Sequence, residues 1–81
     1  MAHVVLPGSM KAAAGGQTEF EIEAGNASQL LARLAHDHPK LKPLLERGVS
    51  ISIDNQLYRE PAFQPIAAES EVYILPKMAG G

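Results

Sequence analysis

Two hydrophobic periodicities alternate along this chain and predict its secondary structure. Residues 18–23 alternate polar and apolar, so a period of two places Phe20 and Ile22 on one face of a strand. From Ala27 the apolar residues recur at the three- and four-residue spacing of a helix, which Pro39 stops. The sequence therefore predicts a half-exposed strand followed by one main helix.

The start of this helix carries a capping signal. Asn26 is a suitable N-cap, and Gln29 is placed to reach back as in a capping box. Beyond the helix, the leucines of residues 41–45 indicate a further helical turn that ends at Gly48. Helical structure is thus expected from Ala27 to Gly48, with an interruption at Pro39.

The other predicted strands are short and are bounded by turn residues. An apolar run at residues 3–6, stopped by Pro7 and Gly8, is consistent with a strand buried on both faces. Residues 49–53 alternate again, and Asp54-Asn55 tolerates the left-handed turn that returns the chain through residues 56–58. Residues 71–75 form a last strand before Pro76, and the irregular connection before it offers Phe63 and Ile66 as core side chains.

This order of elements predicts the fold class. Two strands, a helix and then three strands fit an α+β fold with a mixed sheet of four to five strands and one main helix packed across it, which is a β-grasp arrangement. Residues 1–76 are expected to form the domain, and residues 77–81 a flexible C-terminal tail ending in Gly-Gly.

Composition narrows the function classes. The chain has 81 residues, of which 46% are hydrophobic, and a formal net charge of −2. That charge gives no electrostatic reason to bind nucleic acid or an anionic membrane. The chain has no cysteine, which excludes disulfides, thiolate metal sites and a cysteine nucleophile. With no export signal or membrane-spanning stretch in view, the expected location is the cytoplasm.

Most polar groups in the sequence favour ordinary structural roles. His36 and His38 point in different directions on a helix and lack a third ligand, so no metal site is expected. Gly15-Gly16 precedes a strand instead of a helix, which favours a hairpin turn over a phosphate loop. Two further groups of charged residues are expected to be solvated: the acidic face of Glu19, Glu21 and Glu23, and a basic rim of Lys11, Lys40, Lys42 and Arg47 that could dock an acidic partner.

The tail has a different chemistry. Gly80 and Gly81 end the sequence at a carboxylate, after an apolar strand and a proline. A frayed end is the ordinary interpretation of such a terminus. However, glycines alone let a backbone pass closely through a narrow channel, as a terminal carboxylate must do to be adenylated in a partner's active site.

Residues 71–81, EVYILPKMAGG, resemble the C-terminus of the MoaD/ThiS family of ubiquitin-like sulfur carriers. Family members typically end in a strand of the type E-V-x-x-x-P, two further residues and A-G-G. The likeness extends over the whole element order, and Ala14-Gly15-Gly16-Gln17 is similar to a T-G-G-Q turn of the branch that serves cysteine biosynthesis. Where the family often has D-G-D before the last strand, this chain has Glu69-Ser70-Glu71.

The resemblance implies a role as a protein cosubstrate instead of an enzyme. A ubiquitin-activating-type adenylyltransferase would adenylate Gly81, and a sulfur donor would convert it to a thiocarboxylate. Gly80, Ala79, Met78 and Leu75 would contact the partner. The chain would bind no cofactor itself, because ATP and Mg²⁺ would belong to the activating partner.

The resemblance also implies a second partner, a sulfur-accepting synthase. Molybdopterin biosynthesis, with the large subunit of molybdopterin synthase as acceptor, is the default pathway. Cysteine, thiamin and tRNA thiolation are alternatives, as are a protein modifier conjugated through Gly81 and a plain interaction domain with an inert glycine end.

Overall fold

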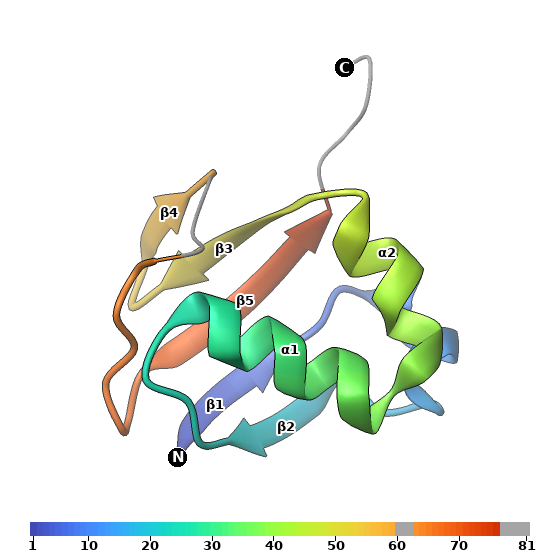
Figure 1. Cartoon of the computed structure of the whole chain (residues 1–81), viewed down its shortest axis with the longest axis horizontal. Coiled ribbons are helices and arrows are strands. Elements are labelled where there is room, and N and C mark those ends of the chain that lie inside the picture. Colours follow the sequence, from blue (N-terminus) through green and yellow to red (C-terminus); the bar gives the residue numbers. More distant parts are fainter. Residues whose placement is uncertain (60–62, 77–81) are drawn as a thin grey trace.

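The computed structural model describes residues 1–59 and 63–76. Ten elements follow one another along them (Figure 1): β1 (Ala2–Val5), η1 (Gly8–Met10), η2 (Ala12–Ala14), β2 (Glu19–Ile22), α1 (Ala27–Asp37), η3 (Pro39–Leu41), α2 (Lys42–Glu46), β3 (Val49–Ile53), β4 (Gln56–Tyr58) and β5 (Glu71–Pro76). The predicted main helix, the further helical turn and the strands are confirmed, with boundaries shifted by a residue or two.

The strands form one mixed sheet in the order β2-β1-β5-β3-β4. The first and last strands, β1 and β5, run parallel in the centre of the sheet, and every other pair in it is antiparallel. Two hairpins, β1–β2 and β3–β4, therefore lie on the outside, and β5 is inserted between them. The sheet has five strands, the larger of the two numbers predicted.

Both α helices lie on the same face of the sheet (Figure 1), so neither of them covers the opposite face. Leu30, Leu34 and Leu41 from the helical layer are at most 1% exposed, as are Val72 and Ile74 of β5. Burying these side chains removes apolar surface from water, and this burial is the main force that holds the helices on the sheet.

The start of α1 differs in one detail from a standard capping box. The side chain of Asn26 accepts a hydrogen bond from the Gln29 N–H at 2.9 Å, as predicted. Gln29 reaches back, but its Oε1 accepts from the Gly25 N–H at 2.8 Å, one residue before the N-cap. The two side chains still satisfy two backbone donors at this helix end.

The predicted turns adopt the left-handed backbone expected of their residues. Asp54 and Asn55 have φ of 49° and 72° between β3 and β4, and Gly15 and Gly16 have φ of 72° and 90°. The latter pair lies in the connection between β1 and β2, which also contains the two short 3-10 helices. Gly15-Gly16 thus belongs to a hairpin connection, which confirms the turn assignment.

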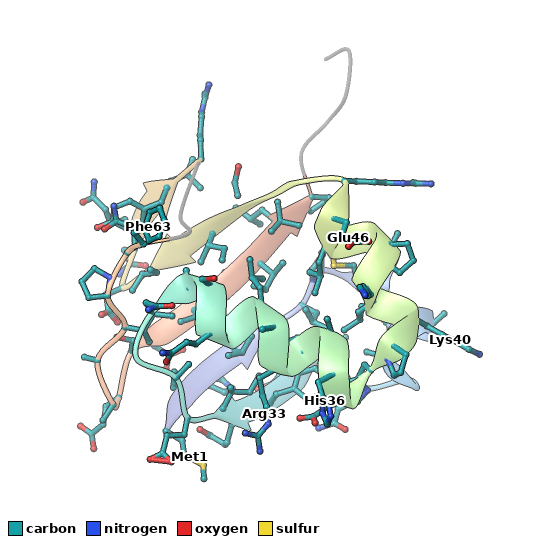
Figure 2. All side chains as sticks on the ribbon, viewed as in Figure 1. Met1, Arg33, His36, Lys40, Glu46 and Phe63 are labelled. Atoms are coloured by element: carbon teal, nitrogen blue, oxygen red, sulfur yellow. The ribbon has the colours of Figure 1, made fainter. Side chains whose placement is uncertain are left out.

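Two predictions of burial are wrong. Phe63 is 91% exposed, whereas Ile66 is buried in the core at 6% exposure. Figure 2 shows Phe63 at the side of the molecule where β4 lies. The strand β1 is buried on one face only, because His3 and Val5 are half-buried on the side that no helix covers. A continuous apolar run such as that of residues 3–6 does not reveal which of its faces a helix covers.

Candidate functional site

Of the residues expected to react or to contact the partner, only Leu75 lies within the described structure. Gly81, Gly80, Ala79 and Met78 lie outside the described residues. Leu75 lies in β5 and is 40% exposed. The structure therefore shows β5, the strand that leads into the tail.

The strand β5 is held on both sides. It pairs in parallel with β1 from His3↔Glu71 to Val5↔Tyr73. On its other side it pairs with β3, and the last register position is Val49↔Pro76. Because Val72 and Ile74 are also buried against the helices, β5 anchors the chain up to Pro76 in the centre of the sheet.

The alternate side chains of β5 point to the uncovered side of the sheet, here called the open face: the side of the strands turned away from α1 and α2. Tyr73 and Leu75 are 44% and 40% exposed on it, and Leu57 of β4 is 51% exposed. Tyr73 is level with Val5 on one neighbouring strand and with Ser52 on the other. Apolar groups therefore spread over several strands beside the start of the tail.

One charged cluster on the open face was not predicted from the sequence. His3 Nε2 lies 2.9 Å from Glu19 Oε1, and His3 Nδ1 lies 3.1 Å from Glu71 Oε2. The hydrogen bonds to Glu71 and then to Glu19 raise the pKa of His3 above its ordinary value. No local motif signals this cluster, since its three residues come from three strands.

A second network fixes the turn before β5. Asp54 Oδ1 accepts the Glu71 N–H at 2.9 Å, and its Oδ2 accepts the Ser70 hydroxyl at 3.1 Å. The Ser70 Oγ in turn accepts the Ala67 N–H at 3.0 Å, and Ser70 is 2% exposed. Ser70 replaces the glycine of the usual D-G-D pattern, and its hydroxyl both donates and accepts a hydrogen bond in closing the turn.

The two histidines on the helical side occupy separate environments. His36 Nδ1 lies 3.3 Å from Asp37 Oδ1, and Arg33 Nε lies 3.3 Å from Asp37 Oδ2. These contacts, led by the one from His36, lower the pKa of Asp37. The ring of His38 instead packs edge-on against Phe20, with centroids 4.9 Å apart.

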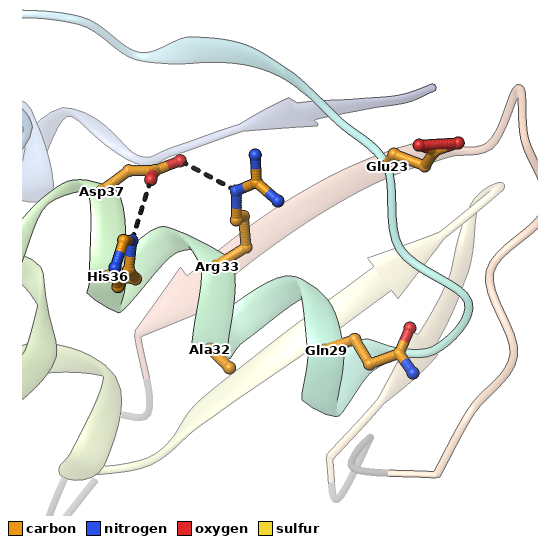
Figure 3. A pocket seen from close by; sticks show the side chains of 6 residues that line it. All are labelled: Glu23, Gln29, Ala32, Arg33, His36 and Asp37. Carbon is orange, nitrogen blue, oxygen red and sulfur yellow. Dashed lines mark hydrogen bonds and ion pairs between the residues drawn. The ribbon is translucent and has the colours of Figure 1, made fainter.

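An open groove runs along α1 (Figure 3). It is lined by Arg33, His36 and Asp37 together with Glu23, Gln29 and Ala32. Nothing in it pairs a nucleophile with a base. Within residues 1–59 and 63–76, no three His, Cys, Asp or Glu side chains gather as a metal site would require. No helix of the described parts of the chain is long and apolar enough to cross a membrane.

The two groups of charged residues that were expected to be solvated are exposed in the structure. Glu19, Glu21 and Glu23 are all exposed, which confirms the solvated acidic face. The four basic residues of the predicted rim are exposed as well. Lys11 directly precedes η2, and Lys40 lies in η3. Lys42 begins α2, and Arg47 directly follows it.

Comparisons with known proteins agree with this architecture. The model of the ThiS family matches residues 4–81. No curated protein matches the chain at a significant level of similarity.

Several solved structures share the fold. The small archaeal modifier protein 1 of Methanosarcina acetivorans superposes with a TM-score of 0.83 at 23% identity, covering 99% of this chain and 95% of that one. CysO in the BexX/CysO complex of Amycolatopsis orientalis gives 0.82 at 18% identity, covering both chains completely. The complex of subunits 1 and 2 of the molybdopterin-converting factor from Helicobacter pylori gives 0.69 at 22% identity, with coverages of 99% and 97%. These likenesses confirm the β-grasp, ubiquitin-like fold.

Proposed function

Because this chain belongs to the ThiS family of ubiquitin-like sulfur carriers, we propose that its Gly81 carboxylate is adenylated and then converted to a thiocarboxylate that donates sulfur. The observation that carries the proposal is the family match, which runs to residue 81 and so includes the A-G-G ending. The anchored strand β5 supports it, because it fixes the point from which residues 77–81 continue.

The chemistry needs little from the folded domain. A carboxylate is a poor acylating group, so a carboxylate oxygen of Gly81 first attacks the α-phosphorus of ATP, and pyrophosphate leaves. Hydrosulfide then attacks the acyl carbon and AMP leaves, which gives the thiocarboxylate. If the donor is a protein persulfide, a thiol must then reduce the acyl disulfide that forms. Gly80 and Gly81 add no side chain to this path.

The remaining catalytic groups would belong to the partners. ATP and Mg²⁺ would be bound by a ubiquitin-activating-type adenylyltransferase, and this chain would be its protein cosubstrate. A sulfur-accepting synthase would be the second partner. Two of the similar structures are complexes with another protein, BexX in one and the second subunit of the molybdopterin-converting factor in the other. Because the cycle consumes ATP, the proposed location is the cytoplasm.

For the acceptor we propose molybdopterin synthase, whose large subunit would receive the sulfur. The likeness to the Helicobacter pylori complex supports this pathway. The likeness to CysO supports a carrier for another pathway, and the likeness to a small archaeal modifier protein supports conjugation of Gly81 to a lysine. All three alternatives begin with adenylation of the same carboxylate.

The test is the mass of the intact protein after incubation with ATP, Mg²⁺, sulfide and each member of a panel of ubiquitin-activating-type adenylyltransferases. We expect a mass gain equal to the replacement of one oxygen by sulfur, and none in a chain that lacks Gly80 and Gly81. If no adenylyltransferase of the panel produces the gain, the carrier proposal is wrong. Conjugates to lysine in place of a free thiocarboxylate would favour the modifier.

A further inference from the structure

One edge of the sheet is the strand β2, which pairs with β1 alone. The register of this pair decides which backbone groups of β2 are left over. The Leu6 N–H donates to the Thr18 carbonyl at 2.7 Å, whereas the His3 N–H donates to the Ser70 carbonyl on the other side of β1, just before β5 begins. The backbone groups of the even-numbered residues of β1 therefore face β2, and those of the odd-numbered ones face β5.

The same alternation holds along β2. Phe20 and Ile22 lie opposite even-numbered residues of β1, so their backbone groups face β1. The N–H and C=O groups of Glu19 and Glu21 therefore point outward from the edge. The Glu19 carbonyl accepts the side-chain N–H of Gln17 at 2.8 Å. Outside the pairing with β1, no hydrogen bond within residues 1–59 and 63–76 involves the backbone of Glu21.

The edge is accompanied by a hollow on each face of the sheet. On the helical side this is the groove along α1, which has Glu23 on one side and Ala32 and Arg33 on the other (Figure 3). On the open face a smaller hollow lies between His3 and Glu21. Because the side chains of a strand point alternately to the two faces of a sheet, a strand laid beside β2 would have room for both sets.

The charges beside this edge differ between the two faces. Glu19 and Glu21 project onto the open face and are exposed, and Glu21 is in no ion pair within the described parts of the chain. In the groove, the Nε of Arg33 lies 3.3 Å from Asp37, so these two charges balance each other. A strand added to β2 would meet negative charge on the open face and a balanced ion pair in the groove.

We propose that the free edge of β2 binds an extended segment of a partner protein as an additional strand, with lysine or arginine at every second position on the open face and uncharged side chains in the groove. The backbone of this segment pairs with the outward groups of Glu19 and Glu21. The inference goes beyond the proposed function, because β1 separates β2 from β5 and the tail takes no part in the binding.

The charges of the edge favour such a segment over a second copy of this chain. If two β2 strands paired antiparallel, their glutamates would face one another, and like charges directly opposite destabilise a sheet. Charged side chains on edge strands protect proteins from self-pairing in this way. A basic segment converts the same repulsion into attraction, and the main-chain hydrogen bonds add affinity of their own.

The test titrates the isotope-labelled full chain with the peptide acetyl-Lys-Val-Lys-Val-Lys-amide at low ionic strength, which limits screening. Amide chemical shifts give the Kd, and hydrogen exchange reports on each backbone N–H. In the free chain the Glu21 N–H should exchange faster than the Phe20 N–H, which faces β1. With saturating peptide, exchange at Glu21 should slow about tenfold or more and exchange at Phe20 should change less than about twofold. A peptide with glutamate in place of each lysine should not bind.

Substitutions at Glu21 separate the charge from the backbone. Glu21→Lys should raise the Kd about tenfold, because it sets like charges side by side. Glu46→Lys makes the same change of charge on α2 and, as the matched control, should keep the Kd within about twofold. Glu21→Gln removes the charge alone, whereas Glu21→Pro also removes the outward N–H, which an edge strand tolerates. The proline variant should therefore bind about fivefold more weakly than the glutamine variant.

Three results would overturn the proposal: no binding of the lysine peptide, binding that protects no amide of β2, or equal Kd values for Glu21→Lys and Glu46→Lys. If Glu21→Pro does not fold, the exchange data and the other variants still decide. A dimer of the free chain in sedimentation, with the Glu21 N–H already protected, would assign the edge to a second copy instead. A chain that lacks Gly80 and Gly81 should bind the peptide with unchanged Kd, so this test does not depend on the proposed sulfur chemistry.

Discussion

His3 and Glu71 lie opposite each other on the parallel strands β1 and β5, and the imidazole Nδ1 is 3.1 Å from the carboxylate Oε2. The other ring nitrogen is 2.9 Å from Glu19 on β2. Both contacts are hydrogen bonds only when both nitrogens carry a proton, since a neutral imidazole would set a lone pair against one carboxylate. When it is doubly protonated, the ring thus joins three strands.

This arrangement predicts a pH dependence of stability. The pKa of His3 is raised in the folded chain by Glu71 and Glu19, and its unfolded value is about 6.5. The stabilisation is therefore complete below the unfolded pKa and is lost as the pH rises through the folded pKa. We expect the difference in melting temperature between wild type and His3→Gln to shrink as the pH is raised from about 5.5 to about 9.

The control for this experiment is Glu71→Gln, which removes the larger of the two interactions that raise the pKa. When His3→Gln is compared with its parent in the Glu71→Gln background, the pH-dependent difference in melting temperature should be smaller than in the wild-type background. It should not vanish, because Glu19 remains. A difference between wild type and His3→Gln that stays constant across the range would show that His3 does not titrate in this way.

A second prediction concerns Asp54, which accepts both the Ser70 hydroxyl and the Glu71 N–H. Asp54→Ala removes both acceptors and should lower the free energy of unfolding by about 2 kcal/mol. Asp54→Asn keeps one acceptor oxygen and tolerates the φ of 49°, so it should cost less. Chemical denaturation measures both values, and equal losses in the two variants would contradict the assigned role of the side-chain oxygens.

A third prediction tests the core. Leu34 is 1% exposed and Ile53 7%, so Leu34→Asp or Ile53→Asp would bury an unpaired charge and should abolish cooperative unfolding. Leu34→Ala should cost about 3 kcal/mol and keep the fold. Ala32→Asp, exposed on the same helix, is the matched control and should melt near wild type. A cooperative melt of Leu34→Asp at the wild-type temperature would refute the assigned packing.

A fourth prediction concerns the start of α1. Asn26→Ala removes the acceptor of the Gln29 N–H and should lower the free energy of unfolding by about 1 kcal/mol. Asn26→Asp retains an acceptor and should stay close to wild type. Because Gln29 caps the Gly25 N–H, Gln29→Ala should destabilise the chain in wild-type and Asn26→Ala backgrounds alike. Full stability in Asn26→Ala would mean that water replaces the cap without cost.

Local sequence patterns determined much of this protein. The period of two in β3 identified the buried face of Ile51 and Ile53, because alternate strand residues point to opposite sides. The change of period at Ala27 identified α1, and Asp54-Asn55 identified its turn, because few residues adopt positive φ. The Gly-Gly ending and the strand before it indicated the family.

Tertiary structure alone decided the rest. His3 meets Glu19 and Glu71 across separations of 16 and 68 residues, and Ser70 meets Asp54 across 16. Periodicity assigns each side chain to a face, but which side chains meet on that face depends on which strands pair and in what register. For the same reason the sequence placed Phe63 in the core and β1 between two covered faces. The parallel insertion of β5 between two hairpins set the open face and the point where the tail begins.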